Sequence, residues 1–344
     1  RIRGLLDKGE RAVLIVPEQF TFESERRLAE SLESGLLDAV VFSFTTLASK
    51  VLRETGDNRV FLSHQGKLMM IRKALEERKP DLKVYGRIAG KPGFTAECDR
   101  LFTRLKRFLI TPDALRSAAE YSGAPDALSA KLRDLALLYE CVEDHLAARY
   151  MDGEDIVNSL IDRMGRSSLC GAHVFVDGFE FLTEQKYRVL ARLMEVAASM
   201  TVTVCVDFNG SCRDRGLFIP GLTSYQRLRE IGEEQGCRIS MVNMERNGSE
   251  GYSAELSHME RELFAQPPAP YSGSGGCVSV FTASGLRAEA EAVCNAIVRA
   301  AQEGTRYRDM AVIVSDMETY APLLNRTMRR YRTVSYTHLR AHET

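Results

Sequence analysis

The chain has 344 residues, of which 44% are hydrophobic and 27% charged, with 46 basic and 47 acidic side chains. This composition excludes disordered, collagenous and fibrous proteins, and the length favours two or three domains. The longest apolar runs are strand-sized, whereas a membrane helix needs about 20 apolar residues. No signal-peptide pattern precedes them, so we expect a cytoplasmic protein. The net charge of -1 excludes a uniformly basic nucleic-acid binder but permits a local basic patch.

Helices and strands alternate in the first part of the chain. The expected elements are a helix at 2–8, a strand at 12–16, a helix from 17 to about 34 closed by Gly35, a strand at 39–42, and a helix at 45–55 stopped by Gly56. Continuous apolar strands are typical of parallel sheets, where both faces are buried. The alternation therefore predicts βαβ units and an α/β fold.

From about residue 63 to residue 166, only helices are predicted. One long apolar stripe has alternating spacings of four and three residues and comprises Leu128, Leu132, Leu135, Tyr139, Val142 and Leu146. Because this block of roughly a hundred residues stands between α/β segments, we predict that it is an insertion into the α/β domain.

The alternating pattern then resumes. The expected elements are a strand at 173–176, a helix at 183–198, a strand at 201–206, a helix at about 224–235 and a short strand at 238–242. Residues 266–276 are rich in Pro, Gly and Ser and predict a linker. A strand at 278–281, a helix at 286–302 and a strand at 311–314 would begin a further α/β unit.

Cysteines and histidines give no sign of a metal or catalytic site. The eight cysteines are scattered, and the closest pair, Cys205 and Cys212, has six residues between. Zinc sites usually place two ligands with two to four residues between them, so we predict reduced, mostly buried thiols and no metal site. The histidines are isolated, and none stands beside a nucleophile.

Three predicted strands end in polar or turn-forming residues, where open parallel sheets bind ligands. These strand ends are Val16-Pro17-Glu18-Gln19, Phe42-Ser43-Phe44-Thr45 and Val176-Asp177-Gly178-Phe179. Asp177 has the position of a Walker B carboxylate that holds Mg²⁺, although a turn-forming role is the alternative. The partner motif G-x-x-x-x-G-K-[ST] is absent, and Gly178 stands where hydrolytic segments usually have Glu. These residues alone therefore give little support to an ATPase.

The near-zero net charge conceals two charged blocks. Residues 65–107 contain 12 basic and 5 acidic side chains, whereas residues 120–164 contain 4 basic and 10 acidic ones. Arg100, Arg104 and Arg107 fall on one helical face. This pattern indicates either a solvated surface with internal salt bridges or a phosphate-tracking surface whose binding to nucleic acid falls steeply with salt.

Two aromatic side chains directly follow strand ends. Phe44 and Phe179 stand at positions where exposed rings could stack on nucleic-acid bases. Packing in the protein core is the alternative for both rings.

Taken together, these segments resemble the N-terminal part of the AddB family, the second subunit of bacterial AddAB helicase–nucleases. The resemblance is carried, in order, by Val16-Pro17-Glu18-Gln19-Phe20-Thr21-Phe22, Phe42-Ser43-Phe44-Thr45-Thr46-Leu47-Ala48, Lys83-Val84-Tyr85, Gly93-Phe94-Thr95, Leu128-Ser129-Ala130-Lys131-Leu132-Arg133-Asp134-Leu135, Val176-Asp177-Gly178-Phe179 with Thr183 and Gln185, and Tyr307-Arg308-Asp309-Met310-Ala311-Val312-Ile313. The ordered set is more specific than any single segment.

The resemblance implies a RecA-like fold of the P-loop superfamily 1, UvrD-like type. Domain 1A would comprise 1–62 and 170–265, interrupted by a 1B-like helical insertion at 63–169; a linker at 266–276 would lead to the start of a second RecA-like domain, 2A-like, at 277–333. The family's glycine-rich nucleotide loop would lie upstream of Arg1. Residues 334–344 resemble translated sequencing-adapter sequence and are set aside.

The family acts in ATP-dependent processing of DNA double-strand ends for recombinational repair. The resemblance implies a helicase-like region that binds single-stranded DNA and reads Chi, in a heterodimer whose AddA-type subunit is the motor. The cofactors would be ATP with Mg²⁺ in the complex and an iron–sulfur cluster in a nuclease domain far beyond residue 344. None of the eight cysteines is assigned to that cluster, and this part alone is expected to be inactive.

The resemblance also assigns candidate site residues. The candidates for DNA contact are Gln19, Thr21, Phe44, Phe179, Arg100, Arg104 and Arg107, and those for a degenerate Walker B site binding nucleotide and Mg²⁺ are Asp177 and Gln185. The alternatives are a P-loop or Rossmann-type nucleotide-dependent enzyme acting on a small molecule, and a catalytically silent interaction scaffold.

Overall fold

The chain divides into two compact units, residues 1–243 and 244–344, which are described separately. The computed structural model describes residues 1–32, 39–57, 59–121, 125–147, 149–206, 215–244, 252–265 and 267–331. The predicted helix stop at Gly35 and the set-aside tail at 334–344 lie outside these ranges. No helix of the described residues is long and apolar enough to cross a membrane.

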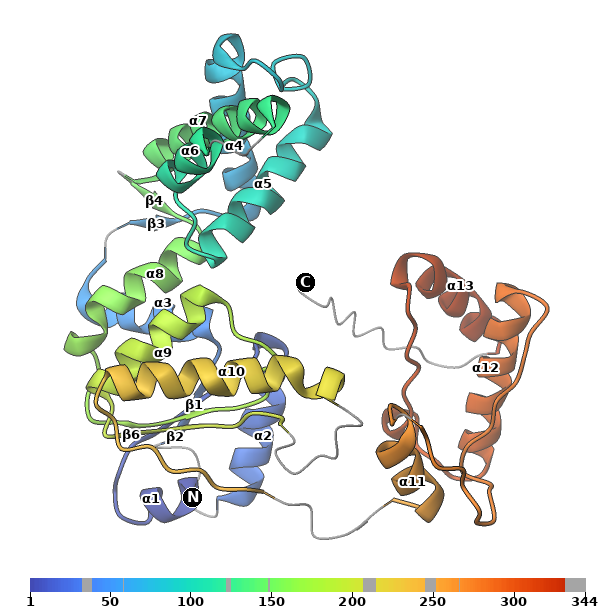
Figure 1. Ribbon diagram of the computed structural model, residues 1–344. Helices are drawn as coiled ribbons and strands as arrows, with labels where there is room; N and C mark the ends of the chain where they lie inside the picture. The colour runs from blue at the N-terminus through green and yellow to red at the C-terminus, as the bar shows by residue number, and fades with distance from the viewer. Residues whose placement is uncertain are drawn as a thin grey trace. The chain divides into compact units, whose positions relative to one another are not determined.

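A four-stranded parallel sheet forms the centre of the first unit (Figure 1). Its strands, in spatial order, are β2 (Ala39–Phe42), β1 (Ala12–Ile15), β5 (His173–Val176) and β6 (Ser199–Val202). In the register, Ala12 lies opposite both Ala39 and His173. The predicted α/β class with a parallel sheet is confirmed, and two strands far apart in sequence flank β1.

Helices cover this sheet because its strands are apolar on both faces. The helices of this part are α1 (Ile2–Leu6), α2 (Thr21–Ser31), α3 (Phe44–Thr55), α8 (Gly153–Arg163), α9 (Glu184–Val196) and α10 (Arg215–Glu234), with 3₁₀ turns at Glu18–Phe20 and Met164–Arg166. Ile15, Leu47, Leu160 and Leu190 are fully buried in one shared core. The helix α3 begins at a capping box on Ser43 and ends at Gly56 in the left-handed conformation, as its sequence predicts.

A block of helices with its own core lies between β2 and β5 in the sequence. It contains α4 (His64–Arg78), α5 (Pro92–Arg107), α6 (Pro112–Glu120) and α7 (Asp126–Ala147), with a 3₁₀ turn at Lys79–Asp81. Phe102 stacks on Tyr139 at its centre, with ring centroids 5.0 Å apart. Figure 1 shows α3, α8 and α9 between this block and the sheet.

The prediction that this region contains only helices is wrong at its base. There β3 (Val60–Phe61) pairs in parallel with β4 (Tyr150–Met151) where the chain enters and leaves the block. The two crossing segments lie side by side, so pairing satisfies backbone groups that would otherwise lack partners.

The second unit is helical in the described residues. It contains α11 (Ala254–Glu262), α12 (Leu286–Gln302) and α13 (Met317–Arg330), with a 3₁₀ turn at Tyr307–Asp309. The strands predicted at 238–242, 278–281 and 311–314 do not form. No neighbouring described strand pairs with these segments, and Val280 and Ile313 are 92% and 95% exposed. The division into the six predicted regions stays a prediction.

Candidate functional site

The three polar strand ends lie at one edge of the sheet. The Val16 amide donates to the Phe42 carbonyl and the Asp177 amide to the Ile15 carbonyl, both at 2.9 Å. The carboxyl ends of β2, β1 and β5 are therefore adjacent, as expected for parallel strands. This hydrogen bonding brings segments about 160 residues apart in the sequence to a single surface.

Gly178 allows the first and third of these ends to approach closely. Its φ is +77°, a left-handed conformation that favours glycine. A Cβ atom there would lie 3.5 Å from Cδ of Pro17, in ordinary contact. The backbone at Gly178 thus turns beside the segment that leads to Gln19, whose side chain is exposed.

Phe44 and Phe179 are in contact with each other. Their ring centroids are 5.3 Å apart with the ring planes inclined by 57°. Phe44 is only 5% exposed, so core packing is its role, whereas Phe179 is half-buried at the surface. The Lys186 ammonium lies 5.7 Å from the centroid of Phe44 and 5.2 Å from that of Phe179, within the range of a cation–π interaction.

We call Gln19, Asp177, Phe179 and Lys186 the strand-end site. It presents a hydrogen-bonding amide, a carboxylate, an aromatic ring and an ammonium group. Lys186 was not singled out by sequence reasoning, although it directly follows the Thr183-x-Gln185 segment. A lysine on a helix surface carries no signal of its own until the fold places it over a ring.

The two predicted Walker B residues have different environments. Asp177 is exposed at the tip of β5, where its carboxylate accepts a hydrogen bond from the Thr203 hydroxyl. Gln185 is buried and donates to the Glu154 carbonyl and to Asn158 Oδ1, at 3.0 and 3.1 Å. The Gln185 amide therefore joins α9 to α8.

The remaining predicted contact residues are placed as follows. Thr21 donates its hydroxyl to the Glu18 carbonyl in the turn that starts α2. On α5, Arg104 is exposed, and Arg100, 71% exposed, pairs with Glu97 at 2.9 Å. Arg107 pairs with Glu154 at 3.0 Å and joins α5 to α8. The three arginines thus divide between an exposed surface and an internal ion pair.

A buried ionic network fixes the base of the helical block. Lys106 on α5 is 4% exposed, and its Nζ lies 3.1 Å from Asp152, 2.7 Å from Asp155 and 2.8 Å from Glu143. Lys67 on α4 lies 3.1 Å from both Asp152 and Asp99. The basic and acidic blocks of the sequence therefore neutralise each other here, as the salt-bridge interpretation predicts.

The network shifts the pKa of each group it contains. Burial alone would lower the pKa of Lys106, but Asp152 and Glu143 raise it well above its usual range. Burial opposes ionisation of Asp152 as well, yet Lys106 and Lys67 hold its pKa below the usual range. Burial raises the pKa of Glu143 despite Lys106. The network stays charged at neutral pH and is structural, because it has no nucleophile.

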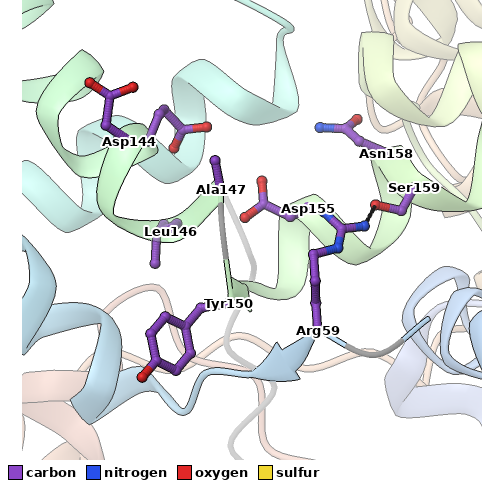
Figure 2. A pocket seen from close by; sticks show the side chains of 9 residues that line it. Arg59, Asp144, Leu146, Ala147, Tyr150, Asp155, Asn158 and Ser159 are labelled. Carbon is purple, nitrogen blue, oxygen red and sulfur yellow. Dashed lines mark hydrogen bonds between the residues drawn. The ribbon is translucent and has the colours of Figure 1, made fainter.

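A cavity of about 300 Å³ lies next to this network (Figure 2). Its lining comes from the end of α7, from β4 and from α8, and includes Asp144, Tyr150 and Asp155. Arg59 enters from the β3 side and donates to Ser159 Oγ at 2.7 Å. The arginine is also paired with Asp57, so the lining charges are largely satisfied within the protein.

The cysteines in the described residues are free thiols. The expectation that they are mostly buried is wrong, because only Cys98, Cys141 and Cys294 are buried, while Cys170, Cys205 and Cys277 are exposed. An exposed thiol at a loop position gives no periodicity from which its burial could be predicted.

The fold and the strand-end site define an α/β protein with a helical insertion and a ligand-binding sheet edge. Residues 4–260 match the family model described as ADDB, N-terminal. The chain belongs to this AddB N-terminal family.

Relatives whose name describes the second, B-type component of an ATP-dependent helicase/deoxyribonuclease support the assignment. The protein of Geobacillus thermodenitrificans is 37% identical over 331 residues, which cover 92% of this chain and 28% of the relative. That of Bacillus subtilis is 33% identical over 337 residues, covering 94% and 29%, and that of Pelotomaculum thermopropionicum is 36% identical over 328 residues, covering 92% and 28%. The chain spans less than a third of the length of these relatives.

Proposed function

We propose that the chain is the DNA-binding, helicase-like region of an AddB-type subunit. The complete protein would belong to an ATP-dependent helicase/exonuclease that processes DNA double-strand ends for recombinational repair in the bacterial cytoplasm. Its sheet would be that of a superfamily 1 RecA-like domain, and an AddA-type subunit would be the motor. The name of the relatives, which includes helicase, deoxyribonuclease and subunit, supports this proposal.

The strand-end site is the single observation that carries the proposal. Single-stranded nucleic acid is bound without strong sequence preference by aromatic rings that stack on bases and by cations that pair with phosphates. Phe179 is the half-exposed ring, held from beneath by Phe44, and Lys186 supplies the adjacent cation. Gln19 can hydrogen-bond to a base edge or phosphate. Reading of Chi would add sequence preference at this same surface.

The exposed arginines of α5 would add a second contact. Arg100 and Arg104 present charge to solvent on one helical face, whereas Arg107 is paired with Glu154. The buried Lys106 network fixes this helix against α8. We therefore assign phosphate contact to Arg100 and Arg104 and a positioning role to Arg107.

The fit of nucleotide and Mg²⁺ to these residues is partial. Asp177 is an exposed carboxylate at a strand tip, which suits Mg²⁺ bound through water, and ATP would supply the phosphates that such a metal bridges. Gln185 does not fit, since its amide hydrogens are bound to Glu154 and Asn158. The motif G-x-x-x-x-G-K-[ST] is absent from the 344 residues. We therefore place the ATP-driven step in the AddA-type partner, and the iron–sulfur cluster outside this region.

Fluorescence anisotropy with a labelled single-stranded oligonucleotide tests the proposal. Lys186→Glu should weaken binding at low salt, because it removes a phosphate partner and introduces a like charge. Lys8→Glu is the matched control, since this exposed lysine precedes β1 and lies at the opposite edge of the sheet. Equal affinities of the two variants would remove the strand-end site from the proposal, and absence of any binding by the parent chain would remove the proposal itself.

A further inference from the structure

A glutamate, a cysteine and a histidine converge between α4 and α7. Cys141 and His145 are four residues apart on α7, so their side chains share one face of the helix. Glu77 reaches them from α4: its Oε2 lies 3.0 Å from Nε2 of His145 and 3.8 Å from Sγ of Cys141. All three donor atoms lie within 4.8 Å of one another.

The donor set suits a first-row transition metal of borderline softness. Zn²⁺ takes Cys sulfur at about 2.3 Å, His nitrogen at about 2.0 Å and carboxylate oxygen at about 2.0–2.2 Å in tetrahedral sites. Donors around such an ion are therefore about 3–4 Å apart, close to the observed separations. Small side-chain rotations would bring the three donors onto a common ion, with water in the fourth position.

The histidine is not satisfied as an ordinary structural residue. Its Nε2 contacts Glu77, but Nδ1 is buried and has no hydrogen-bond partner among the described residues. Buried polar atoms are normally paired. This histidine therefore has unused binding capacity beside a thiol and a carboxylate.

Neighbouring cations compete with a metal ion at these donors. Lys73 Nζ lies 3.7 Å from Glu77 Oε1, and the Arg78 guanidinium hydrogen-bonds to the Cys141 sulfur. Both competing side chains are largely exposed and can rotate into solvent. Arg78 also favours the thiolate, which is the form that binds metal.

We propose that Glu77, Cys141 and His145 bind Zn²⁺ and thereby join α4 to α7 within the helical block. The sequence conceals this site because one ligand comes from another helix. The spacing within α7, three residues between the cysteine and the histidine, is nevertheless within the range of paired zinc ligands. The site is independent of the strand-end site and of DNA binding.

Cobalt titration of the chelator-treated 344-residue chain tests this proposal. Co²⁺ should bind with a stoichiometry of one, give the thiolate-to-cobalt charge-transfer band and the intense visible bands of a tetrahedral site, and be displaced by Zn²⁺. Cys141→Ser should abolish the charge-transfer band, while Cys170→Ser, which removes an exposed thiol elsewhere, should leave it unchanged. Absence of the band in the parent chain, or its survival in Cys141→Ser, would overturn the proposal.

Two further variants keep the test decisive if Cys141→Ser does not fold. His145→Gln and Glu77→Gln change partly exposed ligands, and each should weaken Co²⁺ binding by more than about 10-fold, because loss of even an outer-shell partner costs about 10–100-fold. Arg78→Gln should tighten binding by removing the competing cation. Unchanged affinity in both ligand variants, with native circular dichroism, would equally overturn the site.

Discussion

Replacing Lys106 by Met should strongly destabilise the first unit. Methionine retains most of the volume of the side chain but removes a charge that lies 2.7–3.1 Å from Asp155, Glu143 and Asp152. Each pair is worth roughly 5 kcal/mol in gross Coulomb energy at an effective dielectric constant of about 20. Desolvation offsets most of this attraction, and removing one partner from a buried ion pair costs about 3–5 kcal/mol. Because Lys67 still pairs with Asp152, we expect a loss near about 3 kcal/mol.

Urea unfolding followed by far-ultraviolet circular dichroism measures this loss as a shift of the transition midpoint. Lys50→Met is the matched control: Lys50 pairs with Glu54 at 2.8 Å on a helix surface, where such pairs contribute about 0.3–0.5 kcal/mol. A double-mutant cycle with Asp152→Asn isolates the coupling, since Asn also caps α8. If Lys106→Met cost no more than Lys50→Met, the network would not be the element that fixes α5.

Three other outcomes are expected. Arg100→Glu combined with Arg104→Glu should reduce the dependence of log affinity for single-stranded DNA on log salt by about 1.4, because each phosphate contact contributes about 0.7; an unchanged slope would return both residues to the solvated-surface interpretation. Ser43→Ala should cost about 1 kcal/mol in urea unfolding, since Ser43 caps α3, and a value near zero would contradict that role. Arg59 holds the pKa of Asp57 at about 2, below its ordinary 3.8, so the pair stabilises the folded state above the higher value and this contribution is lost as pH falls through the lower one. The stability deficit of Asp57→Asn, about 2 kcal/mol at neutral pH, should therefore shrink as pH falls from about 5 towards 2; a deficit that does not change with pH would refute the assignment.

The sheet was predictable because its information is local. Each strand is a continuous apolar run between turn residues, and alternation with helices predicts parallel pairing. The end of β6 was not predictable, since Ser199–Val202 pairs with β5 in a register that leaves the apolar residues up to Val206 beyond the ladder. The apolar segment at 278–281 resembles a strand equally well but has no described partner.

The candidate site was predictable only in part, for a physical reason. Adjacent strand ends follow from parallel topology, so the proximity of Gln19 to Asp177 could be expected. Burial of charge could not, because Lys106 and Asp152 are 46 residues apart and each has the composition of a surface residue. Phe44 likewise shows its buried state only when α3 packs onto the sheet.

The most direct test of the central claim is ultraviolet crosslinking of the chain to a single-stranded oligonucleotide, with the attachment sites mapped by mass spectrometry. The account predicts crosslinks at the strand-end site, above all on Phe179, which are lost in Lys186→Glu and retained in Lys8→Glu. Crosslinks that avoid 16–21 and 176–186 and persist in Lys186→Glu would contradict it.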